Sequence, residues 1–458
     1  MSFSALDSQI TGPLFRTERM AGVFSDYARI KAMLRCEEAL ARAQAMACLV
    51  PATLATAIAS ITPDDFNLSE LGQATALSGV PTIPFVRAVQ AKLPRDLEPF
   101  FHFGATTQDI ADTALALQMR EGFTLIARDL ATIISELVSL AERHKSTPCI
   151  GRTYMQHAAP ITFGFKISTR IANILAFAQR LKPLCDQSLL ASLGGPVGTL
   201  TTMGTHGPAI LKAYADDLKL GCPPIAMHAQ RGPMAGIAAW LAGLCEALGA
   251  WGSDIVHLSS TEVAEVSEPY VPGRGGSSAM PHKRNPVSAT VLVAAATAAP
   301  GLASTMFTAM IAPHERPAGA WHAEWHALPQ LFGLTSGALQ EAHYLAKGLN
   351  VDVARMRANI NHTHGLIFAD AASAALAPTR GRADAYAIVE AAANHARSQG
   401  GELETILLAS NLTPSERNAV EQAFRLEPAI AAAAQWVDPV CEKARAVHAA
   451  LLNFVEEA

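Results

Sequence analysis

Long stripes of apolar residues indicate that helices dominate this chain. Between residues 111 and 150, apolar side chains recur in steps of three and four, which places them along one face of a helix. The stripe extends over about thirty residues, or roughly 45 Å at a helical rise of 1.5 Å per residue. Its members are Leu115, Met119, Phe123, Ile126, Leu130, Ile133, Leu137 and Leu140. A second long helix is predicted from a similar stripe that consists of Ile237, Leu241, Leu244, Leu248, Trp251, Ile255 and Leu258.

Two more segments, residues 160–185 and 287–312, are predicted to be long helices. The second has no charged residue from Val287 to Pro313, and its length would allow it to cross a membrane. It is rich in alanine, serine and threonine and is interrupted by Pro300, so we interpret it as a helix of the deep core and expect no membrane partner. No convincing run of strands is found. The pattern predicts an all-α protein with an elongated central helical bundle.

Helix start signals and breaks in the pattern divide the chain into three helical domains. Residues 1–110 contain a start at Ser25-Asp26 and are predicted to form an N-terminal helical domain. Residues 111–350 hold the long stripes and form the predicted central bundle. Residues 351–458, with a further start at Thr413-Pro414, are predicted to form a small C-terminal helical domain.

Composition narrows the range of partners and compartments. Hydrophobic residues make up 50% of the 458-residue chain and charged residues only 16%, which is typical of an oligomer that hides part of its surface. The net charge of −5 argues against a nucleic-acid partner. The seven cysteines are scattered without a C-x-x-C pair, and the first residues lack the features of a signal peptide. We therefore expect a cytoplasmic protein with free thiols.

The segment from Gly273 to Pro286 has the composition of a functional loop. Its glycines permit unusual backbone angles and its prolines break regular structure. Backbone amides, together with Lys283 and Asn285, can converge on one anionic group. A solvated connector would have a similar composition, so that alternative stays open. A phosphate-binding P-loop is excluded because no glycine directly precedes Lys283.

Two other polar segments interrupt the helical pattern, at residues 102–109 and 151–157. The first reads His-Phe-Gly-Ala-Thr-Thr-Gln-Asp and stands at the start of the long predicted helix, where backbone N–H groups favour an anion. Its polar side chains have a second possible role, which is to cap that helix. The second segment, Gly-Arg-Thr-Tyr-Met-Gln-His, lies between two predicted long helices.

Taken together, the three polar segments resemble the fumarase/aspartase superfamily. The signature of that superfamily is roughly G-S-S-x-M-P-x-K-x-N-P, and residues 276–286 match every fixed position. The other two segments match in order and spacing, and the resemblance covers nearly the whole chain. It implies three helical domains, a homotetramer around a shared helical core, active sites built from three subunits, a small polycarboxylate substrate and no cofactor.

The resemblance also implies a chemistry and a set of site residues. Members of the superfamily move a proton at the carbon beside a carboxylate, and an aci-carboxylate intermediate forms. Ser277 matches the catalytic serine, and Lys283 and Asn285 match positions that bind the carboxylate. The candidate catalytic residues are Ser277 and His157. The candidate substrate-binding residues are His102, Thr106, Thr107, Gln108, Thr153, Gln156, Ser278, Met280, Lys283, Asn285 and Arg316.

Within the superfamily, the chain looks most like the cycloisomerases that lactonise a carboxymuconate. The run HERPAGAWHAEWHALP at residues 314–329, with Trp321, Glu324 and Trp325, is the most telling similarity. Adenylosuccinate lyases, argininosuccinate lyases and fumarases carry histidine where this chain has Tyr154. An intermolecular lyase needs a general acid for its leaving group, whereas an internal carboxylate nucleophile is already ionised and needs no base. The tyrosine therefore favours a cycloisomerase.

Several alternatives remain open at this stage. A β-elimination enzyme like adenylosuccinate lyase or argininosuccinate lyase is the second hypothesis, and an inactive structural member of the superfamily is the third. His157 either contacts a substrate carboxylate or makes structural hydrogen bonds. The element His322-x-Glu324-x-His326 resembles a zinc motif only loosely, because the glutamate would point away from the first histidine on a helix. We therefore predict no metal site.

Overall fold

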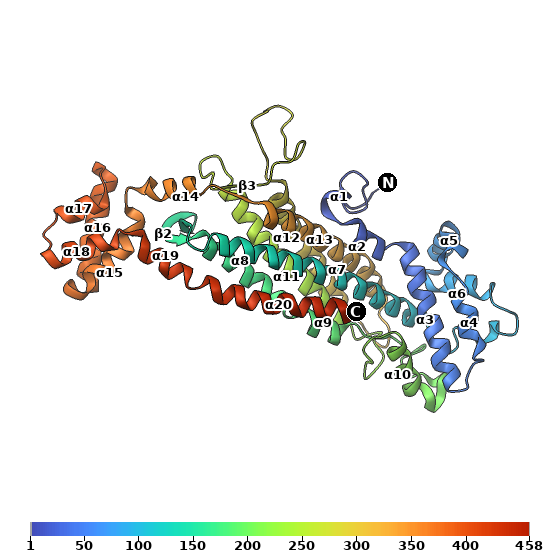
Figure 1. Ribbon diagram of the computed structural model, residues 1–458. Helices are drawn as coiled ribbons and strands as arrows, with labels where there is room; N and C mark the ends of the chain where they lie inside the picture. The colour runs from blue at the N-terminus through green and yellow to red at the C-terminus, as the bar shows by residue number, and fades with distance from the viewer. Residues whose placement is uncertain (1, 458) are drawn as a thin grey trace.

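The computed structural model describes residues 2–457, which form an elongated and almost entirely helical molecule (Figure 1). Its centre is a bundle of long helices that run along the length of the molecule. These helices are α7 (Thr107–Arg143), α8 (Phe163–Ala178), α11 (Gly232–Leu258), α12 (Val287–Ala309) and α13 (Ala320–Gly348). The prediction of an all-α fold with an elongated central bundle is confirmed.

The predicted stripes form the core of this bundle. Every member of the stripe on α7 is buried except Leu115, which is half-buried, and every member of the stripe on α11 is buried. Phe123 of α7 packs edge-on against Trp240 of α11 and Phe332 of α13, with ring centroids 5.7 and 4.9 Å apart. The stripes therefore decide which face of each helix turns inward. The helix predicted over residues 160–185 is divided in two, α8 and α9 (Leu181–Ser188).

The N-terminal part of the chain packs at one end of the bundle (Figure 1). Its largest helix, α3 (Asp26–Met46), begins where predicted, because the Ser25 side chain accepts a hydrogen bond from the Ala28 N–H. Thr62 and Pro63 also form a helix start signal, but only the short 3-10 helix η1 (Pro63–Asp65) follows it. The other helices of this part are α1 (Gly12–Phe15), α2 (Glu18–Val23), α4 (Thr53–Ala59), α5 (Leu68–Ser78), α6 (Thr82–Gln90) and η2 (Glu98–Phe100). Between α9 and α11 lie η3 (Thr201–His206) and α10 (Gly207–Asp217).

The C-terminal part differs from the expectation of one separate domain over residues 351–458. Helices from α15 to α18 have a small core of their own at the far end of the molecule. The last helix, α20 (Val437–Glu457), instead runs back along α7 and α8, and its apolar stripe joins the core of the bundle. The remaining elements are α14 (Val353–Ile360), η4 (Asn361–Thr363), η5 (Leu366–Phe368), α15 (Ala369–Arg380), α16 (Arg382–Gln399), α17 (Leu403–Ala409), α18 (Pro414–Ala423) and α19 (Leu426–Ala434).

Two small antiparallel strand pairs, of which the first is a hairpin, correct the expectation that strands are absent. Strand β1 (Pro148–Thr153) pairs antiparallel with β2 (Gln156–Thr162), and β3 (Val266–Ser267) pairs with β4 (Asn350–Val351). The hairpin contains the predicted polar segment 151–157. The pairing of Thr153 with Gln156 leaves a two-residue turn, Tyr154-Met155, whose φ angles are 50° and 63°. Both turn side chains are exposed.

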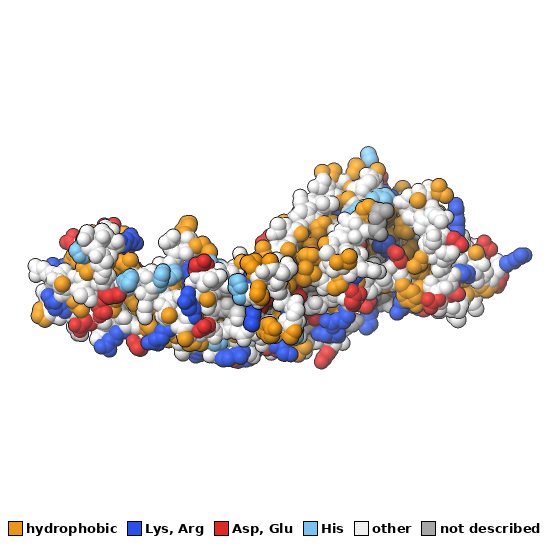
Figure 2. All heavy atoms as spheres, turned by 90° about the horizontal axis from the view of Figure 1, so that it is seen from above, with side chains coloured by type: hydrophobic (Ala, Val, Ile, Leu, Met, Phe, Trp, Pro, Cys, Tyr) orange, Lys and Arg blue, Asp and Glu red, His pale blue; other side chains and the backbone are white. Residues whose placement is uncertain are grey.

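Two helices of the bundle, α11 and α12, have the length and composition of a membrane span. Most of the apolar window of α11 is buried, which is typical of a core helix, whereas less than half of that of α12 is buried. The outer face of α12 exposes Thr290, Thr297, Ala298, Ser304 and Thr308 and carries no charge. In the single chain, the predicted deep-core helix is therefore buried on one face only. Figure 2 shows hydrophobic side chains gathered over the middle of the molecule as well.

Candidate active site

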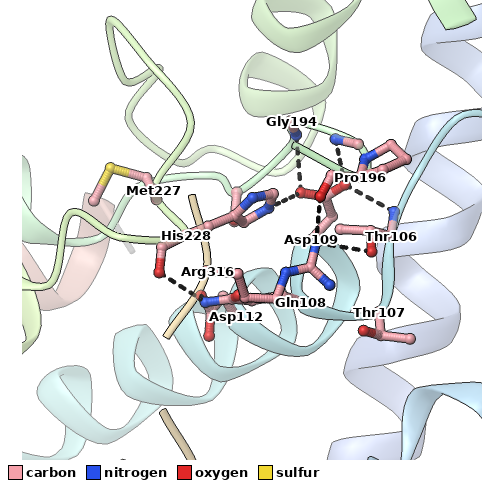
Figure 3. Close-up of polar contacts among 12 residues, drawn as sticks. Thr106, Thr107, Gln108, Asp109, Asp112, Gly194, Pro196, Met227, His228 and Arg316 are labelled. Atoms are coloured by element: carbon pink, nitrogen blue, oxygen red, sulfur yellow. Dashed lines mark hydrogen bonds and ion pairs between the residues drawn. The ribbon is translucent and has the colours of Figure 1, made fainter. Parts of the chain in front are cut away.

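The first predicted polar segment is organised around the buried carboxylate of Asp109, near the start of α7 (Figure 3). Its Oδ1 accepts hydrogen bonds from the Gly194 N–H (2.8 Å) and from Nε2 of His228 (2.6 Å). Its Oδ2 accepts from the Gly195 N–H (2.9 Å) and from the Thr106 N–H (2.9 Å). Asp109 therefore joins the loop at residues 192–200 to the N-terminus of α7, and its two oxygens accept four hydrogen bonds.

Arg316, another candidate substrate-binding residue, lies against this segment. Its Nη2 donates to Oγ1 of Thr106 (3.0 Å) and to the Pro196 carbonyl (3.1 Å). Thr107 is half-buried one residue further along α7, and its carbonyl accepts from the Thr82 hydroxyl. The side chains of Thr106 and Arg316 form a small polar cluster that remains partly exposed.

Gln108 has a supporting position rather than a place at the surface. It is fully buried, and its Nε2 donates to Oδ2 of Asp112 (3.2 Å) and to the His228 carbonyl (3.1 Å). A residue without exposed surface cannot touch a substrate in this arrangement. We therefore assign Gln108 to the packing of α7 against the 228 segment, in place of the predicted substrate contact.

His102 is paired with a buried glutamate that no local sequence pattern singles out. Nδ1 of His102 lies 2.6 Å from Oε1 of Glu37, which is 1% exposed and belongs to α3. Burial by itself lowers the pKa of His102, but the Glu37 carboxylate outweighs burial, so the pKa is raised overall. The backbone of His102 has a φ of 58°, a left-handed conformation that is uncommon for histidine. The pairing favours a cationic imidazolium near Asp109 and Thr106.

The tryptophan–glutamate element at residues 321–325 belongs to a buried ionic network. Arg231 donates from Nε to Glu324 (2.8 Å) and from Nη1 to Asp112 (2.6 Å), and the Trp321 indole donates to Asp112 (2.8 Å). Burial opposes the charged form of Arg231, but the two carboxylates outweigh burial and raise its pKa. These contacts fix the start of α13 to α7. The element at residues 321–325, which was the most telling similarity in the sequence, therefore has a structural role.

The second polar segment occupies the β1–β2 hairpin at the other end of α7. Thr153 and Gln156 are exposed beside the turn. His157 is half-buried, its Nδ1 has no partner among the described residues, and its ring centroid lies 6.2 Å from that of His362. Burial lowers the pKa of His157, and the Arg152 cation lowers it further. His157 is therefore favoured as a neutral imidazole.

An ion pair supports the hairpin behind His157. Arg152 donates from Nη2 to Oε1 of the fully buried Glu265 (2.6 Å), and Asn359 of α14 donates to the same oxygen (2.9 Å). These bonds join β1 to the segment before β3 and to α14. No local spacing in the sequence relates Glu265 to Arg152, so this pairing could not be predicted.

The third segment is the loop at residues 268–286, which stands away from the bundle. Oγ of Ser277 accepts hydrogen bonds from the Ala279 N–H (3.3 Å) and the Met280 N–H (3.0 Å). The other candidate residues of the loop, Ser278, Met280, Lys283 and Asn285, are exposed. Among residues 2–457, Lys283 forms no salt bridge. Its charge is therefore available to an anion.

The structure does not bring the three segments together within one chain. The Thr106 cluster precedes α7 and the His157 hairpin follows it, so the 37 residues of α7 separate them by about 55 Å. Figure 1 shows the N-terminal end of α7 and the hairpin at opposite ends of the bundle. Among the described residues, no hydrogen bond or ion pair joins the tip of the third segment, residues 276–284, to either of them. One small ligand cannot contact all the predicted residues of a single chain.

The described residues contain no group of three or more His, Cys, Asp and Glu side chains that could hold a metal ion. Glu324, the central residue of the loose zinc-like element, is paired with Arg231. His322 lies 3.1 Å from the Gly79 carbonyl through its Nε2. These contacts give both residues a structural role.

Comparisons with known proteins agree with this architecture. A family model described as lyase matches residues 15–301. A 3-carboxy-cis,cis-muconate cycloisomerase of Pseudomonas aeruginosa is 41% identical over 450 residues, which are 97% of this chain and 97% of the relative. Nitrosuccinate lyase of Streptomyces davaonensis is 37% identical over 437 residues, which are 93% of this chain and 92% of the relative.

A solved structure is equally similar. The crystal structure of 3-carboxy-cis,cis-muconate lactonizing enzyme from Pseudomonas putida has a TM-score of 0.89 and 37% identity, and the match covers 96% of this chain and 100% of that one. The resemblance inferred from the three polar segments thus extends to the whole backbone. Because the family model and the relatives match most of its length, this chain is an enzyme of the fumarase/aspartase superfamily.

Proposed function

We propose that this protein is a cycloisomerase that lactonises 3-carboxy-cis,cis-muconate to 4-carboxymuconolactone, a step in the degradation of protocatechuate. The observation that carries the proposal is the similarity of nearly the whole chain to four 3-carboxy-cis,cis-muconate cycloisomerases, at 36–41% identity. Tyr154 supports it, because the hairpin turn lacks the histidine that an intermolecular lyase would use as a general acid. No cofactor takes part in the proposed reaction.

The proposed reaction is an internal addition in which no atom is lost. An oxygen of one substrate carboxylate bonds to a carbon of a neighbouring double bond. The displaced electron pair moves to the adjacent carbon and its carboxylate, and an aci-carboxylate forms. Two negative charges then concentrate on one group, so cations and N–H dipoles placed there stabilise the transition state more than the substrate. We assign this role to Lys283 and Asn285, because Lys283 forms no ion pair with the residues that the structure describes.

Ser277 supplies the proton in this proposal. Its neutral hydroxyl protonates the carbanionic carbon, which completes the lactone, and a proton from water restores the serine. The Ala279 and Met280 N–H groups, at 3.3 and 3.0 Å from Oγ, are placed to stabilise the alkoxide that remains after the transfer. Ser278 has no such pair of donors among the described contacts and is assigned to substrate binding.

We further propose that the active site forms between subunits of a homotetramer. The distance of about 55 Å between the Thr106 cluster and the His157 hairpin supports this, since one small polycarboxylate cannot span it within a chain. The uncharged outer face of α12 offers the surface that another subunit would cover. All seven cysteines are free, which supports the proposal that the protein acts in a reducing cytosol.

A mixing experiment tests the shared site. Chains with Ser277→Ala and chains with Arg316→Ala would each be inactive alone but should regain activity when refolded or coexpressed together, because some sites then receive both intact residues. The matched control mixes Ser277→Ala with Lys283→Ala. These residues share one loop, so no site can recover both. Equal activity of the two mixtures, with mixed tetramers verified by mass, would contradict the proposal.

A lyase acting on a substituted succinate is the second candidate, and the similarity to nitrosuccinate lyase favours it over other lyases. An ultraviolet assay of the purified protein with 3-carboxy-cis,cis-muconate, nitrosuccinate, adenylosuccinate and argininosuccinate distinguishes them. We expect efficient turnover of the carboxymuconate alone. Efficient elimination from any of the succinates would move the protein to the lyase hypothesis, and no turnover of any substrate would support an inactive structural member.

A further inference from the structure

The loop at residues 268–286 is fastened at its base by Arg274. Nη2 of Arg274 donates to Oγ of Ser288 (2.6 Å) and to the carboxylate of Glu341, and the Ser288 hydroxyl donates to the same carboxylate (2.5 Å). The guanidinium carbon also lies 4.4 Å from the centre of the Tyr344 ring. Arg274 thus joins the loop to the start of α12 and to the C-terminal third of α13.

The two ends of the loop are also held in place by hydrogen bonds. The Glu268 carboxylate accepts from the Ser288 N–H (3.1 Å) and the Ala289 N–H (2.9 Å), where its charge favours the N-terminus of α12. The Asn285 N–H donates to the Gly275 carbonyl (2.8 Å) and closes the base. At Gly275 the φ is 68°, and a Cβ atom would lie 2.5 Å from the Asn285 carbonyl oxygen, so a side chain does not fit there.

The tip of the loop, residues 276–284, has a different set of contacts. Its hydrogen bonds to the described residues are local: Ser277 accepts from two nearby N–H groups, and the Lys283 N–H donates to the Met280 carbonyl (3.0 Å). The Arg284 guanidinium stacks on Tyr270 of the same loop at 4.4 Å. Except for Ser277, which is half-buried, every residue of the tip is exposed. The described contacts leave the tip free to move as a unit.

We propose that Arg274 is a positioning residue that divides this loop into a fixed collar and a mobile tip. The collar consists of residues 268–275 and 285–288, and the tip of residues 276–284. Because the collar does not move, closure of the tip delivers Ser277 and Lys283 to the same place over the substrate in each turnover. The kinetic part of this inference rests on the proposed function, whereas the division of the loop does not.

The chemistry of Arg274 supports positioning over substrate binding. Its charge is neutralised by Glu341, which is 5% exposed and forms no salt bridge with any other described residue. A planar guanidinium can stack on Tyr344 while it donates to two oxygens, which an ammonium group does not reproduce. Lysine is therefore an incomplete substitute at this position.

Hydrogen exchange on the full-length protein tests the division without any substrate. In the unmodified protein, peptides that contain the amides of Asn285, Ser288 and Ala289 should exchange slowly, and the tip should exchange fast. In Arg274→Met the collar amides should exchange at least about tenfold faster, while the tip and the core of α7 stay unchanged. Equal protection of the collar in both proteins would overturn the proposal, as would a tip that is protected as well as the collar.

Kinetics test the consequence for catalysis. Arg274→Met should lower kcat by about 10- to 100-fold and change KM by less than about threefold, the pattern of misplaced catalytic groups. Arg284→Met removes a cation from the tip of the same loop and should leave kcat within about threefold. A rise in KM alone for Arg274→Met would make Arg274 a substrate-binding cation and overturn the positioning role.

Two milder variants keep the test decisive if Arg274→Met does not fold. Arg274→Lys retains a charge beside Glu341, and Tyr344→Phe removes only the hydroxyl that donates to the Pro269 carbonyl (3.2 Å). We expect an intermediate loss of collar protection and of kcat for Arg274→Lys, and a smaller loss for Tyr344→Phe. Full retention of both properties in Arg274→Lys would count against the proposal. If collar exchange responds as expected but carboxymuconate is not a substrate, only the proposed function fails.

Discussion

Similar polar residues lie at the N-terminus of α7 and at the tip of the loop at residues 268–286, but their environments are opposite. Asp109 is fully buried, and its two oxygens accept four hydrogen bonds from the 192–195 segment, His228 and Thr106. The tip at residues 276–284 is almost wholly exposed, and its hydrogen bonds are local. The polar contacts of the first region are in place without a ligand, whereas the tip of the loop has only local contacts.

This difference indicates a division of work between the two regions. Fixed donors and cations cost no reorganisation when a carboxylate binds, which suits the cluster of Thr106 and Arg316. A proton donor that acts in a site closed to water is well placed on a loop that can move. Substitutions in the tip should therefore lower the rate of catalysis and leave stability unchanged. Substitutions near Asp109 should lower stability first.

The largest expected effect is on catalysis by the tip. Ser277→Ala should lower kcat by about 10²–10⁴-fold, the scale for a positioned proton-transfer group, and should leave the melting temperature unchanged because the side chain accepts hydrogen bonds only from the loop itself among the described contacts. Stopped-flow or ultraviolet kinetics and thermal denaturation measure the two effects. Ser278→Ala is the matched control and should matter much less. Near-normal kcat in Ser277→Ala, with the loss in Ser278→Ala or His157→Ala, would reassign the proton.

The second effect is on stability at the N-terminus of α7. Asp109→Ala leaves the buried N–H groups of Gly194 and Gly195 without acceptors, at about 1–3 kcal/mol for each buried unsatisfied donor. We expect a loss of at least about 3 kcal/mol per chain, seen as a lower melting temperature or a lower yield of folded protein. Asp109→Asn keeps one carbonyl oxygen and should lose less. An unchanged melting temperature in Asp109→Ala would show that this region is not the rigid partner in the comparison.

A smaller effect concerns the charge of His102. Its raised pKa comes from Glu37, which outweighs burial, so the imidazolium persists above the ordinary pKa of about 6.5. The associated stabilisation is complete below that ordinary pKa and is lost as the pH rises through the higher folded value. If the cation binds substrate, KM should rise over the same range. Glu37→Gln should move this rise in KM to lower pH, as measured by pH profiles, whereas a purely structural Glu37 would lower stability and leave the profile in place.

The smallest expected effect is that of chelation, which should leave activity unchanged. Among the described residues, no cluster of His, Cys, Asp and Glu has the geometry of a metal site, and Glu324 is paired with Arg231. Activity after exhaustive treatment with EDTA, compared with an untreated sample, checks this. Loss of activity that a divalent ion restores would show that a metal supports one of the two regions.

The elements that could be predicted from the sequence are those with a strong local pattern. The stripes on α7 and α11 identified both helices, and the start at Ser25 was right because a capping side chain acts within one turn. The helix α20 was missed although its buried residues, Val437, Cys441, Ala444, Val447 and Leu451, have helical spacing. Its position along α7 and α8, away from helices α15 to α18, depends on the path of the chain. No local spacing in the sequence predicts that path.

The candidate residues show the same limit. The signature at residues 276–286 was visible because its residue types and spacing are contiguous, and so was the family. The buried role of Gln108, the pairing of Glu37 with His102, and the network of Arg231 with Glu324 were not visible, because each joins residues that are far apart in the chain.

The sequence by itself determined the helical class, the inward faces of the main helices and the identity of the family. Periodicity and motifs are properties of neighbouring residues, so they can be recognised without knowledge of the fold. Only the tertiary structure decided which polar residues are buried supports, and that α7 holds the Thr106 cluster and the His157 hairpin about 55 Å apart. The physical reason is that desolvation and hydrogen-bond pairing depend on which distant segments pack together, and that packing is absent from any local pattern.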